Sequence, residues 1–248
     1  MLDVIDYTPG KSLLHRLNPV TKLALAAAII TATFLTQSPF ALTALLALTL
    51  AIGAYAGVAR RLTGLLKVLL PIVVVMFTLQ VAFTPTGEHI VAFATVDGVI
   101  GGLRACLRLV GVALPLVLML SVTRLTDLAN ACVEVLHVPY RYAFTFTTAL
   151  RFVPVFTREM NAIMEAQTAR GVHFDTGNPF KKLALMIPVC IPLLVTSVQK
   201  TDATALAAEQ RGFYLRTRAS SYRRYPMTAT DIAVLGCCLA LVAIGFTL

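Results

Sequence analysis

Long apolar runs dominate the sequence, and polar residues fall mainly between them. A helix that crosses a bilayer needs about 17–25 mainly apolar residues, and five runs approach or reach that length. Asn18 and Pro19 open the first run with a helix cap and a proline at the first helical position. The pattern predicts an all-α, polytopic membrane protein with about five transmembrane helices, over residues 20–36, 39–58, 65–83, 101–122 and 230 to the C-terminus.

The pattern changes in the stretch from residue 123 to residue 228. The apolar runs at 143–157 and 184–198 are short, and arginine or proline interrupts each of them. If only the second run crossed the membrane, the basic residues after it would lie outside the cell, against the usual charge distribution. We therefore expect two long amphipathic helices on or beneath the membrane. The predicted domains are a segment with four transmembrane helices, a cytosolic helical domain and a last transmembrane helix, over 1–122, 123–227 and 228–248.

Composition and charge add an orientation to this membrane protein. Hydrophobic residues make up 58% of the 248, charged residues 13%, and the mean hydropathy is +0.81, whereas soluble domains carry about a quarter charged residues. Residues 124–224 hold 13 of the 21 lysines and arginines. Because such residues concentrate in cytosolic loops, we expect the N-terminus and the 123–228 stretch to be cytosolic. The net charge of +9 then reflects this asymmetry and contact with anionic lipid, not nucleic acid.

The sequence predicts no catalytic, metal or cofactor site of its own. The five cysteines lack CxxC or zinc spacing, and the four histidines are scattered. The "GKS" at residues 10–12 resembles the end of a phosphate-binding loop, but Ile5 stands where that loop needs its first glycine. Any ATP that drives this protein must therefore be hydrolysed by another chain.

Two segments of the cytosolic stretch end in the same way, "AQTARGV" at 166–172 and "AAEQRGF" at 207–213. Gly171 and Gly212 suit the left-handed residue that ends a helix, which puts Arg170 and Arg211 in the last turn. A cation there complements the helix dipole by about 0.3–1 kcal/mol, which explains a single ending of this kind. Two copies on long cytosolic helices also indicate a guanidinium that grips a partner's carboxylate with two hydrogen bonds.

Three motifs in this order resemble those of the transmembrane T component of energy-coupling factor transporters, the ABC-type importers of micronutrients. They are "YTPGKSLLHRLNPVTK" (7–22), "RFVPVFTREMNAIMEAQTARG" (151–171) and "PLLVTSVQKTDATALAAEQRGF" (192–213). The family usually has Asp-Pro where this chain has Asn18-Pro19, and Ala-Arg-Gly where it has Gln210-Arg211-Gly212. The first change preserves a helix cap, and the second keeps the arginine and the glycine.

The resemblance implies a coupling subunit in a multi-pass bacterial or archaeal cell membrane. In the family two cytosolic ABC ATPases, which bind ATP and Mg²⁺, each take one Arg-Gly end of the coupling helices, and a separate membrane-embedded S component binds the substrate. Carried over, the ATPase contacts are Arg170 and Arg211, with helix ends shaped by Ala169, Gly171, Gln210 and Gly212. The S component would contact the apolar faces over 143–157 and 184–198, among them Val189 and Leu193. The substrate, a vitamin or a metal ion, is selected by the S component.

Two other classes of function compete with this interpretation. Arg104 and Arg108 lie one turn apart near the outer end of the fourth predicted helix, where they either reach the lipid headgroups or face a partner or a buried acid. In a stand-alone secondary transporter or channel they would bind the substrate inside the membrane. An intramembrane enzyme would instead need clustered acids or histidines, and the 12 acidic residues are spread out.

Overall fold

The computed structural model describes residues 10, 12–83, 89–91, 94–174, 177, 179–215 and 224–247. The chain divides into two compact units. The first, called the membrane unit from here on, comprises Met1–Leu136 and Tyr225–Leu248. The second, called the helix-pair unit, comprises His137–Arg224. The predicted cytosolic domain, 123–227, is therefore slightly longer than the helix-pair unit.

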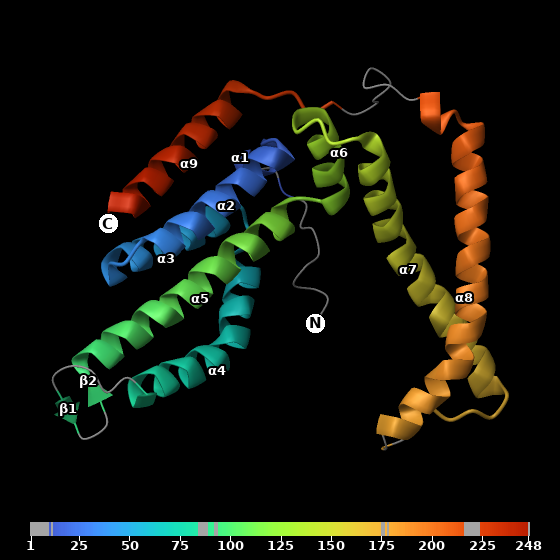
Figure 1. Ribbon diagram of the computed structural model, residues 1–248, viewed down its shortest axis with the longest axis horizontal. Helices are drawn as coiled ribbons and strands as arrows, with labels where there is room; N and C mark the ends of the chain where they lie inside the picture. The colour runs from blue at the N-terminus through green and yellow to red at the C-terminus, as the bar shows by residue number, and fades with distance from the viewer. Residues whose placement is uncertain are drawn as a thin grey trace. The chain divides into compact units, whose positions relative to one another are not determined.

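Helices with one short hairpin build the membrane unit (Figure 1). Each of the five predicted transmembrane segments is helical, so the prediction of a helical polytopic protein is confirmed. The short strands pair antiparallel, with His89 opposite Thr95. The elements of this unit are α1 (Leu13–Arg16), α2 (Pro19–Leu35), α3 (Pro39–Tyr55), α4 (Ala59–Phe83), β1 (His89–Val91), β2 (Ala94–Thr95), α5 (Val96–Val122), α6 (Leu125–Val135) and α9 (Ala229–Thr247).

Length and hydropathy identify four helices among the described residues that can cross a membrane. Three of them are the predicted spans α4, α5 and α9, and α2 and α3 are apolar but have only 17 residues each. The fourth, Leu183–Gln210, contains the apolar run that the sequence places on or beneath the membrane. Length and composition therefore do not separate a span from an amphipathic helix at this segment.

Local signals fix where two of these helices begin. The side-chain oxygen of Asn18 accepts a hydrogen bond from the Val20 amide at 3.0 Å, which caps α2 as the Asn-Pro pair predicts. Gly57 has a φ of +76° and ends α3 in a tight turn. As a result α4 begins at Ala59, so Arg60 and Arg61 lie in its first turn and not in a loop.

The core of the membrane unit forms around α5, which packs against α2, α3 and α4, while α9 packs against α2. Small residues let these helices approach closely. A Cβ atom on Gly245 of α9 would lie 3.1 Å from the Ala32 backbone of α2, and one on Gly111 of α5 would lie 2.9 Å from Thr33. Packing that tolerates no added methyl group makes these contacts specific.

Arg108 has a structural partner in the membrane unit. Its Nη2 donates to the carbonyl oxygen of Thr36 at 3.0 Å, just after the last turn of α2. The carbonyl groups at a helix end lack intrahelical partners and carry a partial negative charge. Arg108 therefore ties the end of α2 to α5, which is a packing role within the membrane unit.

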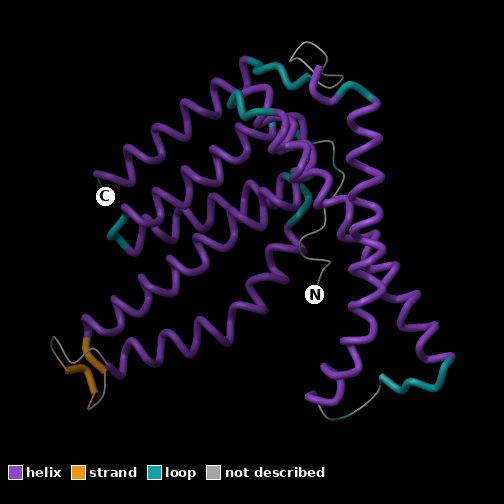
Figure 2. Tube along the Cα trace, turned by 45° about the vertical axis from the view of Figure 1, so that its right-hand side comes forward, coloured by secondary structure: helices purple, strands orange, loops and turns teal. Residues whose placement is uncertain are grey.

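The helix-pair unit consists of two long helices and a short 3₁₀ turn. They are α7 (Tyr140–Ala169), α8 (Pro179–Gln210) and η2 (Phe213–Leu215). Figures 1 and 2 show that α7 and α8 run in opposite directions and cross each other. At 1.5 Å per residue each helix is roughly 45 Å long. Prolines lie inside both, Pro154 in α7 and Pro188 and Pro192 in α8.

Candidate functional site

The first Arg-Gly sequence forms the C-terminal end of α7. The helix ends at Ala169, Arg170 is its C-cap residue, and Gly171 follows with a φ of +89°. The Gly171 amide donates to the Thr168 carbonyl at 2.9 Å, and the Val172 amide reaches back to the Gln167 carbonyl at 3.1 Å. These bonds close the helix with a left-handed glycine, as predicted, and leave Ala169 and Arg170 exposed.

The second Arg-Gly sequence forms the C-terminal end of α8 in the same way. Gly212 has a φ of +69°, and its amide donates to the Glu209 carbonyl at 2.9 Å. Gln210 ends the helix, and Arg211 is exposed directly after it. Among the described residues neither Arg170 nor Arg211 forms an ion pair. Both guanidinium groups therefore lie at the ends of ordered helices and are available to an external carboxylate.

Aromatic contacts hold the second end in place. The rings of Phe144 and Phe213 lie 4.7 Å apart between centroids, and those of Tyr140 and Phe213 lie 5.7 Å apart. Aromatic pairs at these separations stabilise a contact beyond their buried area. The turn that follows Arg211 is therefore packed onto the first turns of α7.

A cleft of about 750 Å³ opens beside this aromatic contact. Its lining includes two guanidinium groups, those of Arg151 and Arg211, together with the hydroxyl groups of Thr148 and Thr204. No acidic residue lines it among the described residues. Such a lining favours an acidic group, because two arginines bind carboxylates with charge-assisted hydrogen bonds. Sequence reasoning missed Arg151, which lies 60 residues from Arg211 in the chain.

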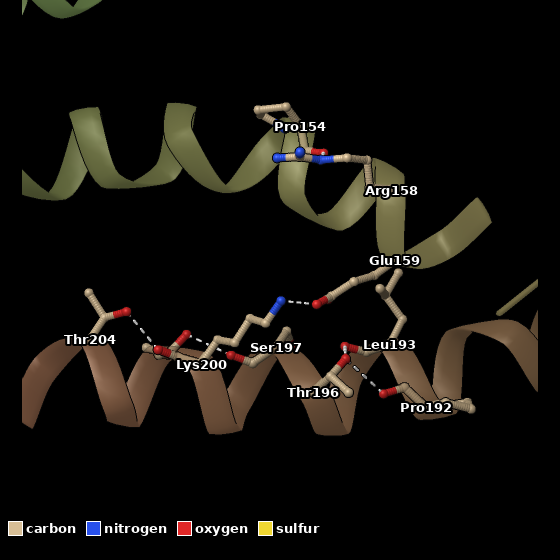
Figure 3. A network of polar contacts seen from close by, with 10 residues as sticks. Pro154, Arg158, Glu159, Pro192, Leu193, Thr196, Ser197, Lys200 and Thr204 are labelled. Atoms are coloured by element: carbon tan, nitrogen blue, oxygen red, sulfur yellow. Dashed lines mark hydrogen bonds and ion pairs between the residues drawn. The ribbon is translucent and has the colours of Figure 1, made fainter. Parts of the chain in front are cut away.

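An ion pair joins the two long helices near their middle (Figure 3). The Nζ of Lys200 on α8 donates to the Oε1 of Glu159 on α7. Both side chains are partly exposed, at 40% and 24%, so water screens the pair and its contribution to folding is under about 1 kcal/mol. Its position relative to the two Arg-Gly ends is the informative feature.

The ion pair lies equally far from the two Arg-Gly ends. Arg170 comes eleven residues after Glu159 on α7, and Arg211 comes eleven residues after Lys200 on α8. Eleven helical residues span about 17 Å. Because the helices are antiparallel (Figure 1), the two Arg-Gly ends lie in opposite directions from the Glu159–Lys200 contact. Sequence reasoning missed Glu159 and Lys200, because their separation of 41 residues, the same as that of Arg170 and Arg211, does not by itself indicate a contact.

The predicted S-component contacts lie on the covered face of α8. Val189 is 2% exposed, Leu193 is half-buried, and Lys200 on the same face contacts α7. Four exposed apolar residues of α8 form a row on the opposite face, since residues three and four apart stack along a helix. They are Ile187, Ile191, Leu194 and Val198, each 59–64% exposed. A contact of Val189 and Leu193 with an S component stays a prediction, and the opposite row offers the more accessible surface.

Metal ligands do not gather in this region or elsewhere in the part of the chain that the structure describes. No group of three or more His, Cys, Asp or Glu residues there is arranged to hold a metal ion.

Comparisons with known proteins agree with the motifs. Residues 10–221 match the CbiQ family, described as cobalt transport protein. The chain is 34% identical over 219 residues to the energy-coupling factor transporter transmembrane protein EcfT of Acidaminococcus fermentans, with 83% of this chain and 81% of the relative covered. It is 30% identical over 258 residues to the protein of the same name from Bacillus subtilis, with 98% and 96% covered.

The chain belongs to the CbiQ family. It is a multi-pass membrane component of an energy-coupling factor transporter, a complex that contains further components. The resemblance inferred from the three motifs is thereby confirmed. Family membership covers the membrane unit and the helix-pair unit together, since the matched residues include α2 to α8 and both Arg-Gly ends.

Proposed function

We propose that this chain is the coupling subunit of an ATP-driven importer. Two cytosolic ABC ATPases bind the Arg-Gly ends of α7 and α8, and a separate S component in the membrane binds the substrate. When ATP closes the ATPase pair, the helix-pair unit moves and the S component releases a vitamin or a metal ion into the cell. ATP and Mg²⁺ are bound by the ATPases, and this chain binds no cofactor.

One observation carries this proposal: the two Arg-Gly ends have the same local structure and point in opposite directions. Each ends in a left-handed glycine, and each arginine lies eleven residues beyond the Glu159–Lys200 contact. A pair of ATPases presents two equivalent grooves, so two equivalent contacts that face apart suit it better than one. A favourable interaction of each arginine with its helix dipole would not require the two ends to match each other.

The chemistry of the ends supports acidic grooves on the ATPases. An arginine fork holds a carboxylate with two parallel hydrogen bonds, and a lysine cannot reproduce that geometry. At the second end Arg151 adds a further guanidinium across the cleft from α8. We therefore expect the groove for Arg211 to present more negative charge than the groove for Arg170.

The proposed contacts with the ATPases also require one orientation of the chain in the membrane. Cytosolic ATPases reach both ends only if the whole helix-pair unit and the N-terminus lie in the cytosol. If α8 crossed the membrane, Arg170 and Arg211 would lie on opposite sides of it. The concentration of basic residues in 124–224 supports the cytosolic arrangement.

Co-purification with the ATPases tests the proposal. An Arg170→Ala, Arg211→Ala double variant should lose the ATPases, because each truncation leaves an acid of the groove unpaired at a cost of about 2–5 kcal/mol. Each single variant should retain a weaker assembly, and a lysine at either position should rescue only part of it. Exposed Arg158, which donates to the Pro154 carbonyl of its own helix, provides the matched control as Arg158→Ala.

A contrary result is equally clear. If the double variant keeps its ATPases and its uptake, the arginines only complement the helix dipoles, and the effect of each is under about 1 kcal/mol. Uptake by the purified chain alone, lost on Arg104→Ala or Arg108→Ala, would favour the stand-alone transporter instead.

A further inference from the structure

Tyr225 is the first residue of the membrane unit after the chain leaves the helix-pair unit. Each of its polar groups forms a hydrogen bond. Its backbone amide donates to the Oε2 of Glu134 at 2.6 Å, its hydroxyl group donates to the Oδ1 of Asp127 at 3.1 Å, and its carbonyl oxygen accepts from the Nδ2 of Asn18 at 2.9 Å. We call these four residues the neck clamp.

The neck clamp joins both connections of the helix-pair unit to each other. Glu134 lies in the last turn of α6, two residues before the membrane unit ends at Leu136. Tyr225 lies where the chain returns. The hydrogen bond between them holds together the two points where the chain leaves and re-enters the membrane unit. Because Glu134 accepts through a carboxylate, this bond is of the strong, charge-assisted kind.

Asn18 extends the neck clamp to two transmembrane helices. Its side-chain oxygen caps α2 by accepting a hydrogen bond from the Val20 amide. Its backbone amide donates to the Oδ1 of Asp231 at 2.9 Å. Asp231 in turn accepts from the amide of Thr228, also at 2.9 Å, at the start of α9. Asn18 is 5% exposed and Asp231 is 1% exposed. Buried networks of this kind are rigid when every member is bonded.

A second buried bond brings in α5 at the same end of the unit. The Nζ of Lys22, one turn after the cap of α2, donates to the carbonyl of Val122 at 3.4 Å, and Val122 is the last residue of α5. Lys22 is 6% exposed and also donates to the carbonyl of His15 at 3.1 Å. The ends of α2, α5, α6 and α9 therefore meet in one polar cluster that includes Tyr225.

A simple connection between two helices does not need this arrangement. A linker that lets two parts move independently exposes its backbone to water and has few fixed contacts. Here the amide, the carbonyl and the side chain of one residue are all bonded, and the partners come from α6 and from the start of α2. A displacement of the returning chain must therefore act on α2 and α6 directly.

We propose that Glu134, Asn18 and Tyr225 are positioning residues that transmit movement of the helix-pair unit to the transmembrane helices. This inference rests on the proposed coupling function and names a part of it that the Arg-Gly ends do not provide. The ends receive the movement from the ATPases, and the neck clamp passes it to α2 and α9. Weakening the neck clamp should uncouple ATP hydrolysis from uptake without releasing the ATPases.

The test compares uptake and ATP hydrolysis in membrane vesicles that contain the whole complex. Glu134→Ala removes the acceptor for the Tyr225 amide, and uptake per ATP hydrolysed should fall roughly tenfold, as expected for the loss of one charge-assisted bond. Glu134→Gln keeps a neutral acceptor for the same amide, so the ratio should fall clearly less than in Glu134→Ala. Tyr225→Phe removes the hydroxyl group that donates to Asp127, and the ratio should fall between the two. The exposed acid Asp97 at the start of α5 supplies the control variant Asp97→Ala.

The outcomes separate this inference from the proposed function. An unchanged ratio in Glu134→Ala with its ATPases bound overturns the neck clamp, as does an equal fall of hydrolysis and uptake. Glu134→Gln as impaired as Glu134→Ala also overturns it, since the charge and not the bond would then matter. If Glu134→Ala yields little folded protein, Asn18→Ser removes the donor to the Tyr225 carbonyl and must lower the ratio. Failure of the unaltered chain to bind ATPases overturns the coupling function itself, and with it the role of the neck clamp.

Discussion

The contact between Glu159 and Lys200 is weak, but its position along the two helices is informative. A pair this exposed contributes little to folding, yet it lies at the same distance from both Arg-Gly ends. The other carboxylate oxygen of Glu159 is buried and has no hydrogen-bond partner among the described residues. We therefore expect the pair to help align the turns of α7 and α8 that meet, and with them the two arginines.

Reversing this pair tests that role. Glu159→Lys and Lys200→Glu each place like charges opposite one another, and each should lower uptake several-fold while folding changes by under about 1 kcal/mol. The double reversal restores an attractive pair and should recover most of the uptake, as a coupling between contacting residues requires. Uptake assays with thermal unfolding in parallel measure both effects. Additive losses in the double variant would exclude a direct contact.

The two faces of α8 have different neighbours. Val189, Leu193 and Lys200 share the face that meets α7, whereas Ile187, Ile191 and Leu194 lie exposed on the other. Large exposed apolar rows on a folded protein mark a contact with a partner or a membrane. Under the proposed function, the S component is the partner that we expect to cover this row.

Charges on the exposed row should block the S component and spare the ATPases. Ile191→Asp and Leu194→Asp each place a carboxylate under an apolar partner, where it stays unpaired at a cost of several kcal/mol. Uptake should fall by at least roughly tenfold, while the ATPases still co-purify. Gln199→Asp adds the same charge at an exposed polar position and serves as the control. Normal uptake in both row variants would assign this face to lipid.

At the scale of the whole molecule, the side of the membrane reached by each helix end decides the function. The coupling function requires both Arg-Gly ends in the cytosol, although Leu183–Gln210 is also long and apolar enough to cross a bilayer. A transmembrane α8 would separate the ends and leave no common partner. The distribution of basic residues favours the first arrangement.

Cysteine labelling in whole cells distinguishes the two arrangements. In a cysteine-free background, single cysteines at His173 and Tyr214, both exposed and each three residues beyond an Arg-Gly arginine, should resist an impermeant reagent until the cells are opened. A cysteine at Asp97, at the start of α5, should react from outside, because the loop before it carries no lysine or arginine. Reaction of only one of the first two positions from outside would show that α8 crosses the membrane.

Features set by neighbouring residues could be predicted from the sequence alone. The five apolar helices, the cap at Asn18 and the left-handed Gly171 and Gly212 all follow from side chains within a few positions of each other. The start of α4 was misplaced, although Gly57 is an equally local signal for it. Membership of the family also rested on motifs that are read along the chain.

Contacts between distant residues were decided only by the tertiary structure. Lys200 meets Glu159 across 41 residues, and Asn18 bonds to Tyr225 across 207. Val189 is buried, although the sequence around it is apolar on every face of the helix and does not show which face is covered. Periodicity states that a helix has an apolar face, but the direction of that face depends on which element packs against it. The Arg-Gly ends were therefore visible in the sequence, whereas the ion pair between them and the neck clamp emerged only once the chain had folded back on itself.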